Sequence, residues 1–205
     1  MIDNKLYLEK GKGEPIILLH GLFGALSNWK TVVNQFAKTH RVIIPKIPLT
    51  EVDVKKANLE SLTDYVKKFI NKQRLKNFIL IGNSLGGHIA LFYTILYPKN
   101  VKKLILTGSS GLYENSFGGS FPKRGDYKYI EDRVNHTFYN PDILTKKYVD
   151  DIFKTLNDNA KCLNIITIAR SAQRNNLAKK LYKIKCPTLL VLSLIHISEP
   201  TRPLE

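Results

Sequence analysis

The feature that most constrains the fold is a set of short apolar runs separated by segments with helical periodicity. Five runs of six or seven residues, rich in Ile, Leu and Val, lie at 15–20, 41–47, 77–82, 102–108 and 187–192. Strands that are apolar along their whole length are typical of parallel sheets covered on both faces. We expect helices between them, capped by Ser27 or Asn28 and by Asn58, with a third ended by Pro98. This order predicts an α/β fold with a mostly parallel sheet flanked by helices.

Residues 112–180 interrupt the alternation of strands and helices. They open with a stretch rich in Gly, Ser and aromatic residues and continue with helical patterns to about Lys180. Strand character returns at Lys185. A chain of 205 residues can bury one sizeable core, so an insertion in a single domain is the natural interpretation. We therefore expect a core at 1–111, a helical cap at 112–180 and a return to the core at 181–191.

The composition, with 43% hydrophobic and 24% charged residues, is ordinary for a soluble globular protein. No segment approaches the roughly 20 apolar residues that cross a bilayer. The N-terminal residues lack the apolar stretch of a signal peptide. The cysteines, Cys162 and Cys186, form no disulfide framework and suit a reducing compartment. We expect a cytoplasmic protein with no membrane partner.

The net charge of +15 raises the question of a nucleic-acid partner. Lysine outnumbers arginine by 25 to 7, and the lysines are dispersed along the chain. Pairs such as Lys55–Lys56 and Lys102–Lys103 are interpreted as solvated edges, because no Arg-rich stripe or basic face with interleaved aromatic residues is present. Nucleic-acid binding therefore rests on charge alone, and we expect none. The composition leaves the oligomeric state open.

The strongest chemical signal is Gly82-Asn83-Ser84-Leu85-Gly86, which follows one apolar run and precedes a helical pattern. This is the G-x-S-x-G pattern of a serine nucleophile on a sharp turn between strand and helix. Glycines two positions on either side let the strand and the helix pass closely. The start of the following helix lends its N–H groups to a developing oxyanion. The pattern predicts Ser84 as the nucleophile and the Leu85 N–H as one oxyanion donor.

A second signal, His20-Gly21-Leu22-Phe23-Gly24, directly follows the run at 15–20. The second donor of such an oxyanion hole comes from the loop after an earlier strand. We expect the Leu22 N–H to be that donor, with the Phe23 N–H as the next candidate, and we place Phe23 at the substrate. His20 is interpreted as a structural histidine that shapes the loop.

These motifs, the helical insertion and the KIKCPTLLV strand resemble the α/β-hydrolase superfamily, over about Lys5 to Val191. The chain looks most similar to bacterial capped enzymes that include small-ester esterases and carbon–carbon bond hydrolases. The resemblance implies a Ser–acid–His triad in chain order that acts through an acyl-enzyme, with no cofactor and no metal. One departure is the segment Lys46–Leu49, which stands where members often carry an Asp and a Gly-rich loop. We expect that segment to lie beside the sheet, away from the nucleophile.

None of the other histidines stands where the resemblance requires a base. His88 is expected to be packed or to cap a helix, His40 to be exposed before a strand, and His136 to lie in the insertion. Arg170 and Arg174 are four residues apart and share one helix face. If that face looks onto Ser84, they could hold a substrate carboxylate; otherwise they form a solvated basic face.

The last residues do not fit a final helix or strand. Leu192 to Arg202 match, codon by codon, the in-frame translation of a transposase-end sequencing adapter. We therefore expect 192–205 to be a non-native tail, so that His196 is not a catalytic histidine. The natural protein is expected to continue for roughly 60–80 further residues. The resemblance places the missing acid and histidine in that part.

Together these features predict a serine hydrolase that acts on a small carboxylic ester or related acyl compound. Its partner is a small-molecule substrate. The alternatives are a hydrolase that cleaves a carbon–carbon bond in a diketone-type acid and, from another class, a non-catalytic ligand receptor on the same fold. The exposed serine on a strained turn argues against the receptor. The chain 1–205 itself is expected to be inactive.

Overall fold

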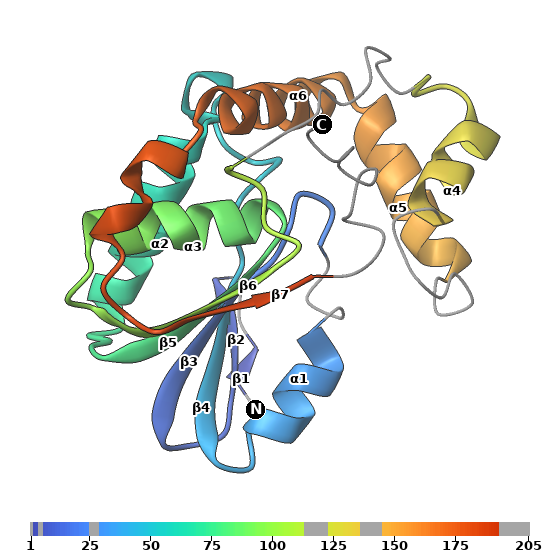
Figure 1. The fold of residues 1–205 in the computed structure, drawn as a ribbon. Coiled ribbons are helices and arrows are strands. Elements are labelled where there is room, and N and C mark those ends of the chain that lie inside the picture. Colours follow the sequence, from blue (N-terminus) through green and yellow to red (C-terminus); the bar gives the residue numbers. More distant parts are fainter. Residues whose placement is uncertain (1, 4–5, 25–28, 113–122, 136–144, 193–205) are drawn as a thin grey trace, which may run out of the picture.

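The sheet has seven strands in the computed structural model, which describes residues 2–3, 6–24, 29–112, 123–135 and 145–192. Its strands run in the order β1-β2-β4-β3-β5-β6-β7 (Figure 1). Their bounds are Ile2–Asp3, Tyr7–Lys10, Glu14–Leu19, His40–Pro45, Phe78–Asn83, Val101–Thr107 and Thr188–Val191 for β1 to β7. From β4 to β7 all neighbours are parallel, whereas β1 and β2 pair antiparallel at one edge. The predicted mostly parallel α/β fold is confirmed.

The register of the central strands places the ends of β3 and β5 side by side. Leu19, the last residue of β3, pairs with Gly82 near the end of β5. On the other side of β5, Asn83 pairs with Thr107, the last residue of β6. The loops after all three strands therefore leave the same edge of the sheet. In open α/β sheets this carboxyl edge is where sites form.

Helices cover both faces of the sheet. Successive strand residues point to opposite faces, so strands that are apolar along their length present apolar side chains on both. Ile17 and Leu19 of β3 pack in one cluster with the helices α2 (Leu59–Lys72) and α3 (Leu85–Leu96). Ile16 and Leu18 pack in a second cluster with Trp29 and Val33, beside and within α1 (Lys30–Phe36). Figure 1 shows α2 and α3 on one side of the sheet and α1 on the other.

The predicted helix starts are met to different degrees. The Asn58 side chain accepts a hydrogen bond of 2.8 Å from the Ser61 N–H and caps α2, as expected. α1 begins at Lys30 with Trp29 at its cap position and no side-chain cap, while Ser27 and Asn28 lie outside the described residues.

His40 is the first residue of β4 and is half-buried, so the expectation that it precedes the strand and is exposed is wrong. Its ring packs edge-on against Phe36.

The described part of the segment between β6 and β7 is largely helical, as its sequence predicts. It contains α4 (Tyr127–Asn135), α5 (Lys146–Asn157) and α6 (Asn159–Arg174), followed by the 3₁₀ turn η4 (Ala178–Lys183). A further 3₁₀ turn, η2 (Val54–Lys56), precedes α2. Side chains of α4 and α5 share a small apolar cluster with the start of α6. Further along α6, Ile165, Ile168 and Ala172 join the cluster that α2 and α3 form on the sheet. α6 therefore connects the helical segment to the core.

No helix in these described ranges is both long and apolar enough to cross a bilayer.

Candidate active site

Ser84 occupies a strained turn between β5 and α3. Its φ of 53° and ψ of −120° lie outside the regions that non-glycine residues normally adopt. Three main-chain hydrogen bonds fix the residue: its N–H donates to Thr107, and its carbonyl accepts from the N–H groups of His88 and Ser110. Ser84 itself is exposed at the edge of the sheet. The turn therefore presents a hydroxyl to solvent from a backbone that its surroundings hold in place.

The glycines of the motif are required by close packing of the backbone. A Cβ atom on Gly86 would lie 2.3 Å from the Leu19 carbonyl oxygen, and one on Gly82 would lie 2.3 Å from the Gly86 carbonyl oxygen. Real Cβ atoms do not make such contacts, so a side chain at either position would push α3 away from the sheet. This explains the glycine spacing on either side of Ser84.

The loop after β3 lies directly beside the nucleophile turn. A Cβ atom on Gly21 would lie 3.2 Å from the Cβ of Ser84. The loop is a tight turn in which the Gly24 N–H donates to the Gly21 carbonyl over 3.0 Å. Leu22 and Phe23, between these glycines, are half-buried and pack on the core cluster. The loop thus begins directly beside Ser84, and Leu22 is the residue that follows Gly21 in it.

Leu85 is the first residue of α3 and is buried. Its N–H is among the four that an α-helix leaves without an intrahelical acceptor. The positive end of the helix macrodipole lies at the same point. The structure therefore brings together Ser84, Leu85 and the loop of Leu22 and Phe23.

His20 is a buried, neutral part of the loop. Its Nε2 accepts a hydrogen bond of 3.2 Å from the Ile47 N–H, so its Nδ1 carries the proton and donates to the Gly21 carbonyl over 3.0 Å. Burial lowers the pKa of His20, while the hydrogen bond to Gly21 acts in the opposite direction. The histidine shapes the loop, as its position predicts. The segment at Lys46–Leu49 is closer to the site than expected, because Ile47 fixes this ring.

Asn83 holds the nucleophile turn through its side chain, a role that sequence reasoning did not identify. Its Nδ2 donates to the carbonyl of Thr107 over 3.1 Å and to its Oγ1 over 3.0 Å. The amide thus ties the residue before Ser84 to the end of β6. The only sequence signal was its place in the variable position before the serine.

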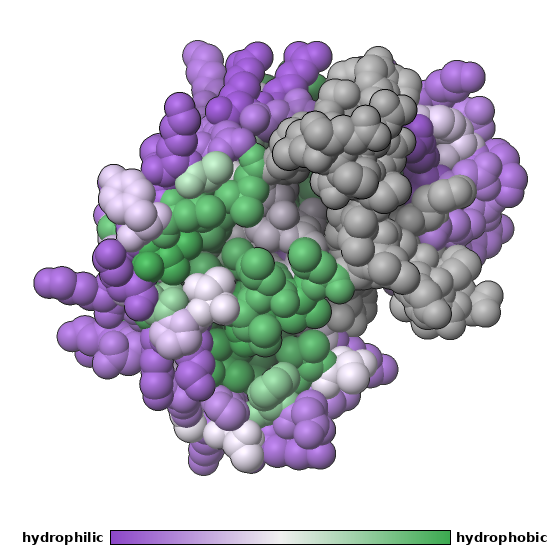
Figure 2. Space-filling view, viewed as in Figure 1, coloured by the Kyte–Doolittle hydropathy of each residue, from purple (hydrophilic) through white to green (hydrophobic). Residues whose placement is uncertain are grey.

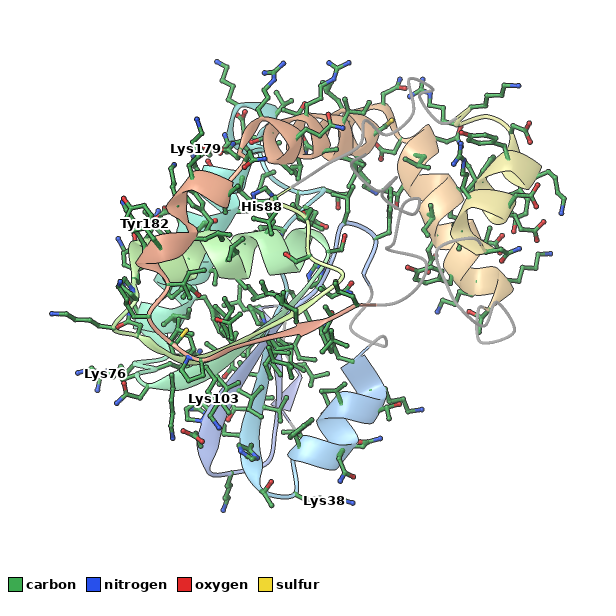
Figure 3. All side chains as sticks on the ribbon, in the orientation of Figure 1. Lys38, Lys76, His88, Lys103, Lys179 and Tyr182 are labelled. Carbon is green, nitrogen blue, oxygen red and sulfur yellow. The ribbon has the colours of Figure 1, made fainter. Side chains whose placement is uncertain are left out.

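His88 is buried on α3 beneath the end of α6 (Figure 3). Its Nε2–H donates to the Asn175 carbonyl over 2.9 Å, and its Nδ1 lies 3.4 Å from Ser110 Oγ. Burial lowers its pKa, chiefly opposed by the hydrogen bond to Asn175. His88 is therefore packed, as expected. No His ring and no carboxylate among the described residues hydrogen-bonds to the Ser84 hydroxyl, and His136 and His196 lie outside those residues.

Arg170 and Arg174 do not lie on the face of α6 that meets the core. That face carries Ile168 and Ala172. Each arginine follows one of these residues by two positions, which places it on roughly the opposite side of the helix. The two arginines are exposed and line a shallow pocket of about 450 Å³, together with Asn58 and Glu60 at the start of α2. The two arginines therefore face away from the core, on an exposed side of α6 beside the start of α2.

The described residues contain no group of three or more His, Cys, Asp or Glu side chains that could hold a metal ion. The groups that the described part of the site offers are a serine hydroxyl and main-chain N–H donors. These are the elements of nucleophilic attack on a carbonyl group with stabilisation of an oxyanion.

Comparisons with known proteins agree with this geometry. The family model described as alpha/beta hydrolase fold matches residues 14–139. The chain is 29% identical to a 2-hydroxymuconate semialdehyde hydrolase from Pseudomonas sp. (strain CF600), over 71% of the chain and 49% of that protein. It is 28% identical to Lipase 1 from Psychrobacter immobilis, over 92% and 65%. The chain thus spans less than two thirds of the length of these curated relatives.

Solved structures show the same fold. An alpha/beta hydrolase enzyme from the metagenome of sediments from the lagoon of Mar Chica, Morocco, is 36% identical with a TM-score of 0.72, covering 94% of this chain and 74% of that one. A meta-cleavage product hydrolase from Pseudomonas fluorescens IP01 has a TM-score of 0.74 at 18% identity, covering 91% and 74%. The strand order, the strained serine turn and the family match over residues 14–139 lead to one assignment: this chain belongs to the alpha/beta hydrolase fold family.

Proposed function

We propose that the protein is a serine hydrolase that cleaves a small carboxylic ester or related acyl compound through an acyl-enzyme on Ser84. The observation that carries the proposal is the strained, exposed Ser84, with Gly21 directly beside it. Strain of this kind persists only where the surroundings over-determine it, and it is typical of functional sites. The curated relatives include proteins named as hydrolases and as a lipase, which supports the same class.

In the proposed reaction, Ser84 Oγ attacks the carbonyl carbon of the substrate and its proton passes to a base. The oxyanion that forms accepts hydrogen bonds from the N–H groups of Leu22 and Leu85. Collapse of this intermediate breaks the bond to the leaving alcohol, which takes a proton, and water then hydrolyses the acyl-enzyme. Phe23, which packs beside the turn, is assigned to the substrate pocket.

The base is assigned to a His–acid pair carried after β7 by a longer form of the protein. A serine hydroxyl is a weak nucleophile without such a base. The oxyanion hole and binding alone can leave about a thousandfold acceleration over water. The chain 1–205 is therefore expected to turn over substrate at less than about a thousandth of the rate of the longer form.

The helical segment 112–180 is proposed to form a cap on this site. Two contacts support it. The Tyr148 hydroxyl of α5 donates to the Phe23 carbonyl, and Asn164 of α6 donates to the carbonyls of Thr50 and Val52. Both contacts reach loops that follow strands at the carboxyl edge of the sheet.

A second candidate is hydrolysis of a carbon–carbon bond in a diketone-type acid. It is favoured by the names of several relatives, among them the 2-hydroxymuconate semialdehyde hydrolase. Such an acid would need a carboxylate ligand, and the candidates Arg170 and Arg174 lie on an exposed side of α6. An ester needs no such ligand, so the ester reaction is the first proposal.

The test is a comparison of two substrate sets with the longer form of the protein. A panel of activated short-chain esters and a vinylogous diketone acid are assayed under pre-steady-state conditions. We expect a burst of released alcohol equal to the enzyme concentration, because the acyl-enzyme accumulates. Turnover confined to the diketone acid would favour the second candidate, and no burst with any ester would contradict the acyl-enzyme.

A further inference from the structure

Tyr148 donates a hydrogen bond to the loop that carries the proposed oxyanion donor. It lies in the first turn of α5, where Thr145 caps the helix through the Tyr148 N–H. Its hydroxyl reaches across to the Phe23 carbonyl over 2.7 Å, although the two residues are 125 positions apart in the chain. The rings of Tyr148 and Phe23 also pack in the apolar cluster of α4 and α5.

The loop continues this hydrogen bond from one peptide group to the next. The Phe23 carbonyl and the Gly24 N–H belong to the same peptide, and that N–H donates to the Gly21 carbonyl over 3.0 Å. The Gly21 carbonyl shares its peptide with the Leu22 N–H. A hydrogen bond to the Phe23 carbonyl therefore polarises two peptides in series, and the second of these peptides carries the Leu22 N–H.

Hydrogen bonds arranged head to tail strengthen one another, by about 10–30% per bond. The Gly21 carbonyl receives a second donor, Nδ1 of His20, over 3.0 Å. Both inputs make the Leu22 N–H a stronger donor and hold its peptide in a fixed orientation. Preorganised donors of this kind are what stabilise charge that develops in a transition state.

We propose that Tyr148 of α5 is a positioning residue that orients and polarises the Leu22 N–H through the peptides of Phe23–Gly24 and Gly21–Leu22. The inference rests on the proposed role of Leu22 as an oxyanion donor. It gives the helical segment a part in the chemical step, in addition to covering the site. Removal of the hydroxyl weakens one donor and leaves the substrate pocket in place.

The experiment compares Tyr148→Phe with Tyr127→Phe. Tyr127 is a matched control because its hydroxyl donates to Asp150 over 2.7 Å, which also ties α5 to a neighbouring segment, and its ring packs in the same cluster. The first readout needs no reaction: amide proton shifts and hydrogen exchange of Gly24 and Leu22 are measured by NMR in the chain 1–205. We expect Tyr148→Phe to move both amide shifts upfield and to speed exchange of the Gly24 amide about tenfold, with no change in Tyr127→Phe.

The second readout is the kinetics of the longer form with an activated ester. Removing a whole oxyanion donor typically costs a hundredfold or more in kcat, so weakening one is expected to lower kcat about 3- to 10-fold. KM should stay within about twofold, because ground-state binding is unchanged. A general loosening of the helical segment would instead raise KM and affect both variants alike.

Unchanged Gly24 and Leu22 amides in Tyr148→Phe, or equal changes in Tyr127→Phe, would overturn the inference. A longer form that shows no turnover at Ser84 would contradict the proposed function. The amide readout would still decide whether the hydrogen-bonded relay exists, so the two failures can be told apart.

Discussion

β5 and β7 are apolar strands of one sheet with opposite surroundings. Phe78 and Leu80 of β5 are fully buried, whereas Leu189 and Leu190 of β7 are 55% and 58% exposed. Figure 2 shows apolar side chains gathered on the face along which β7 runs in Figure 1. The sequences of the two strands are alike, so an apolar pattern indicates which side chains need cover and says little about what covers them.

The comparison also explains where the reactive turn is placed. Ser84 follows β5, which lies between β3 and β6 and is covered by helices on both faces. A strained backbone needs such surroundings to persist. β7 is the outermost strand of the described sheet and does not provide them.

The largest expected effect is on the packing behind the nucleophile turn. Gly86→Ala would force a Cβ against the carbonyls of Leu19 and His20, so we expect the free energy of unfolding to fall by about 3–5 kcal/mol. Gly125→Ala is the control, because a Cβ at Gly125 meets nothing within 4 Å. Urea denaturation of both variants measures the difference. Equal stabilities would show that α3 and the end of β3 are not closely packed.

The second prediction compares equivalent truncations in the two strands. Leu80→Ala removes a fully buried side chain and is expected to cost about 2–5 kcal/mol of unfolding free energy. Leu190→Ala removes a largely exposed one and should stay within about 0.5 kcal/mol. The midpoints of urea unfolding report both values. A cost above about 2 kcal/mol at Leu190 would mean that β7 is covered in solution.

The third prediction concerns association through the exposed strand. Unpaired, apolar sheet edges recruit other chains. We expect the chain 1–205 to self-associate in a concentration-dependent way, and Leu190→Lys to weaken this by about tenfold in dissociation constant. Leu163→Lys on α6 is the control, since Leu163 is 50% exposed but lies away from the sheet edge. Analytical ultracentrifugation of the three proteins decides, and identical association of both variants would exclude the β7 edge.

The smallest effect is a dependence of stability on pH. The pKa of His20 in the folded chain is lowered from 6.5, mainly by burial, so the unfolded chain binds more protons in the window below that value. Its contribution to stability is fully present above about pH 6.5 and is lost as pH falls toward the lowered pKa. His20→Asn should reduce the slope of unfolding free energy against pH below about pH 6.5. An unchanged slope would show that His20 is protonated or exposed when the chain is folded.

Local sequence patterns predicted the five parallel strands, the Asn58 cap and the turn at Ser84, because each depends on neighbouring residues. They did not predict β1 and β2, which are short strands of mixed apolar and polar residues at the edge of the sheet. The contacts of Asn83 with Thr107 and of Tyr148 with Phe23 join residues far apart in the chain, so no local pattern marks them. The arginine face of α6 has a related limit: periodicity predicts that Arg170 and Arg174 share a side of the helix but cannot predict where that side points.

The central claim is that Ser84 is the nucleophile, and the most direct test is labelling by a fluorophosphonate probe in the longer form of the protein. The modified residue is mapped by mass spectrometry in the unchanged protein, in Ser84→Ala and in the control Ser109→Ala, which removes a neighbouring hydroxyl that donates to the Ser110 carbonyl. The account predicts modification at Ser84, retained in Ser109→Ala and lost in Ser84→Ala, with turnover reduced on the order of a millionfold in the latter. Undiminished labelling of Ser84→Ala would contradict it.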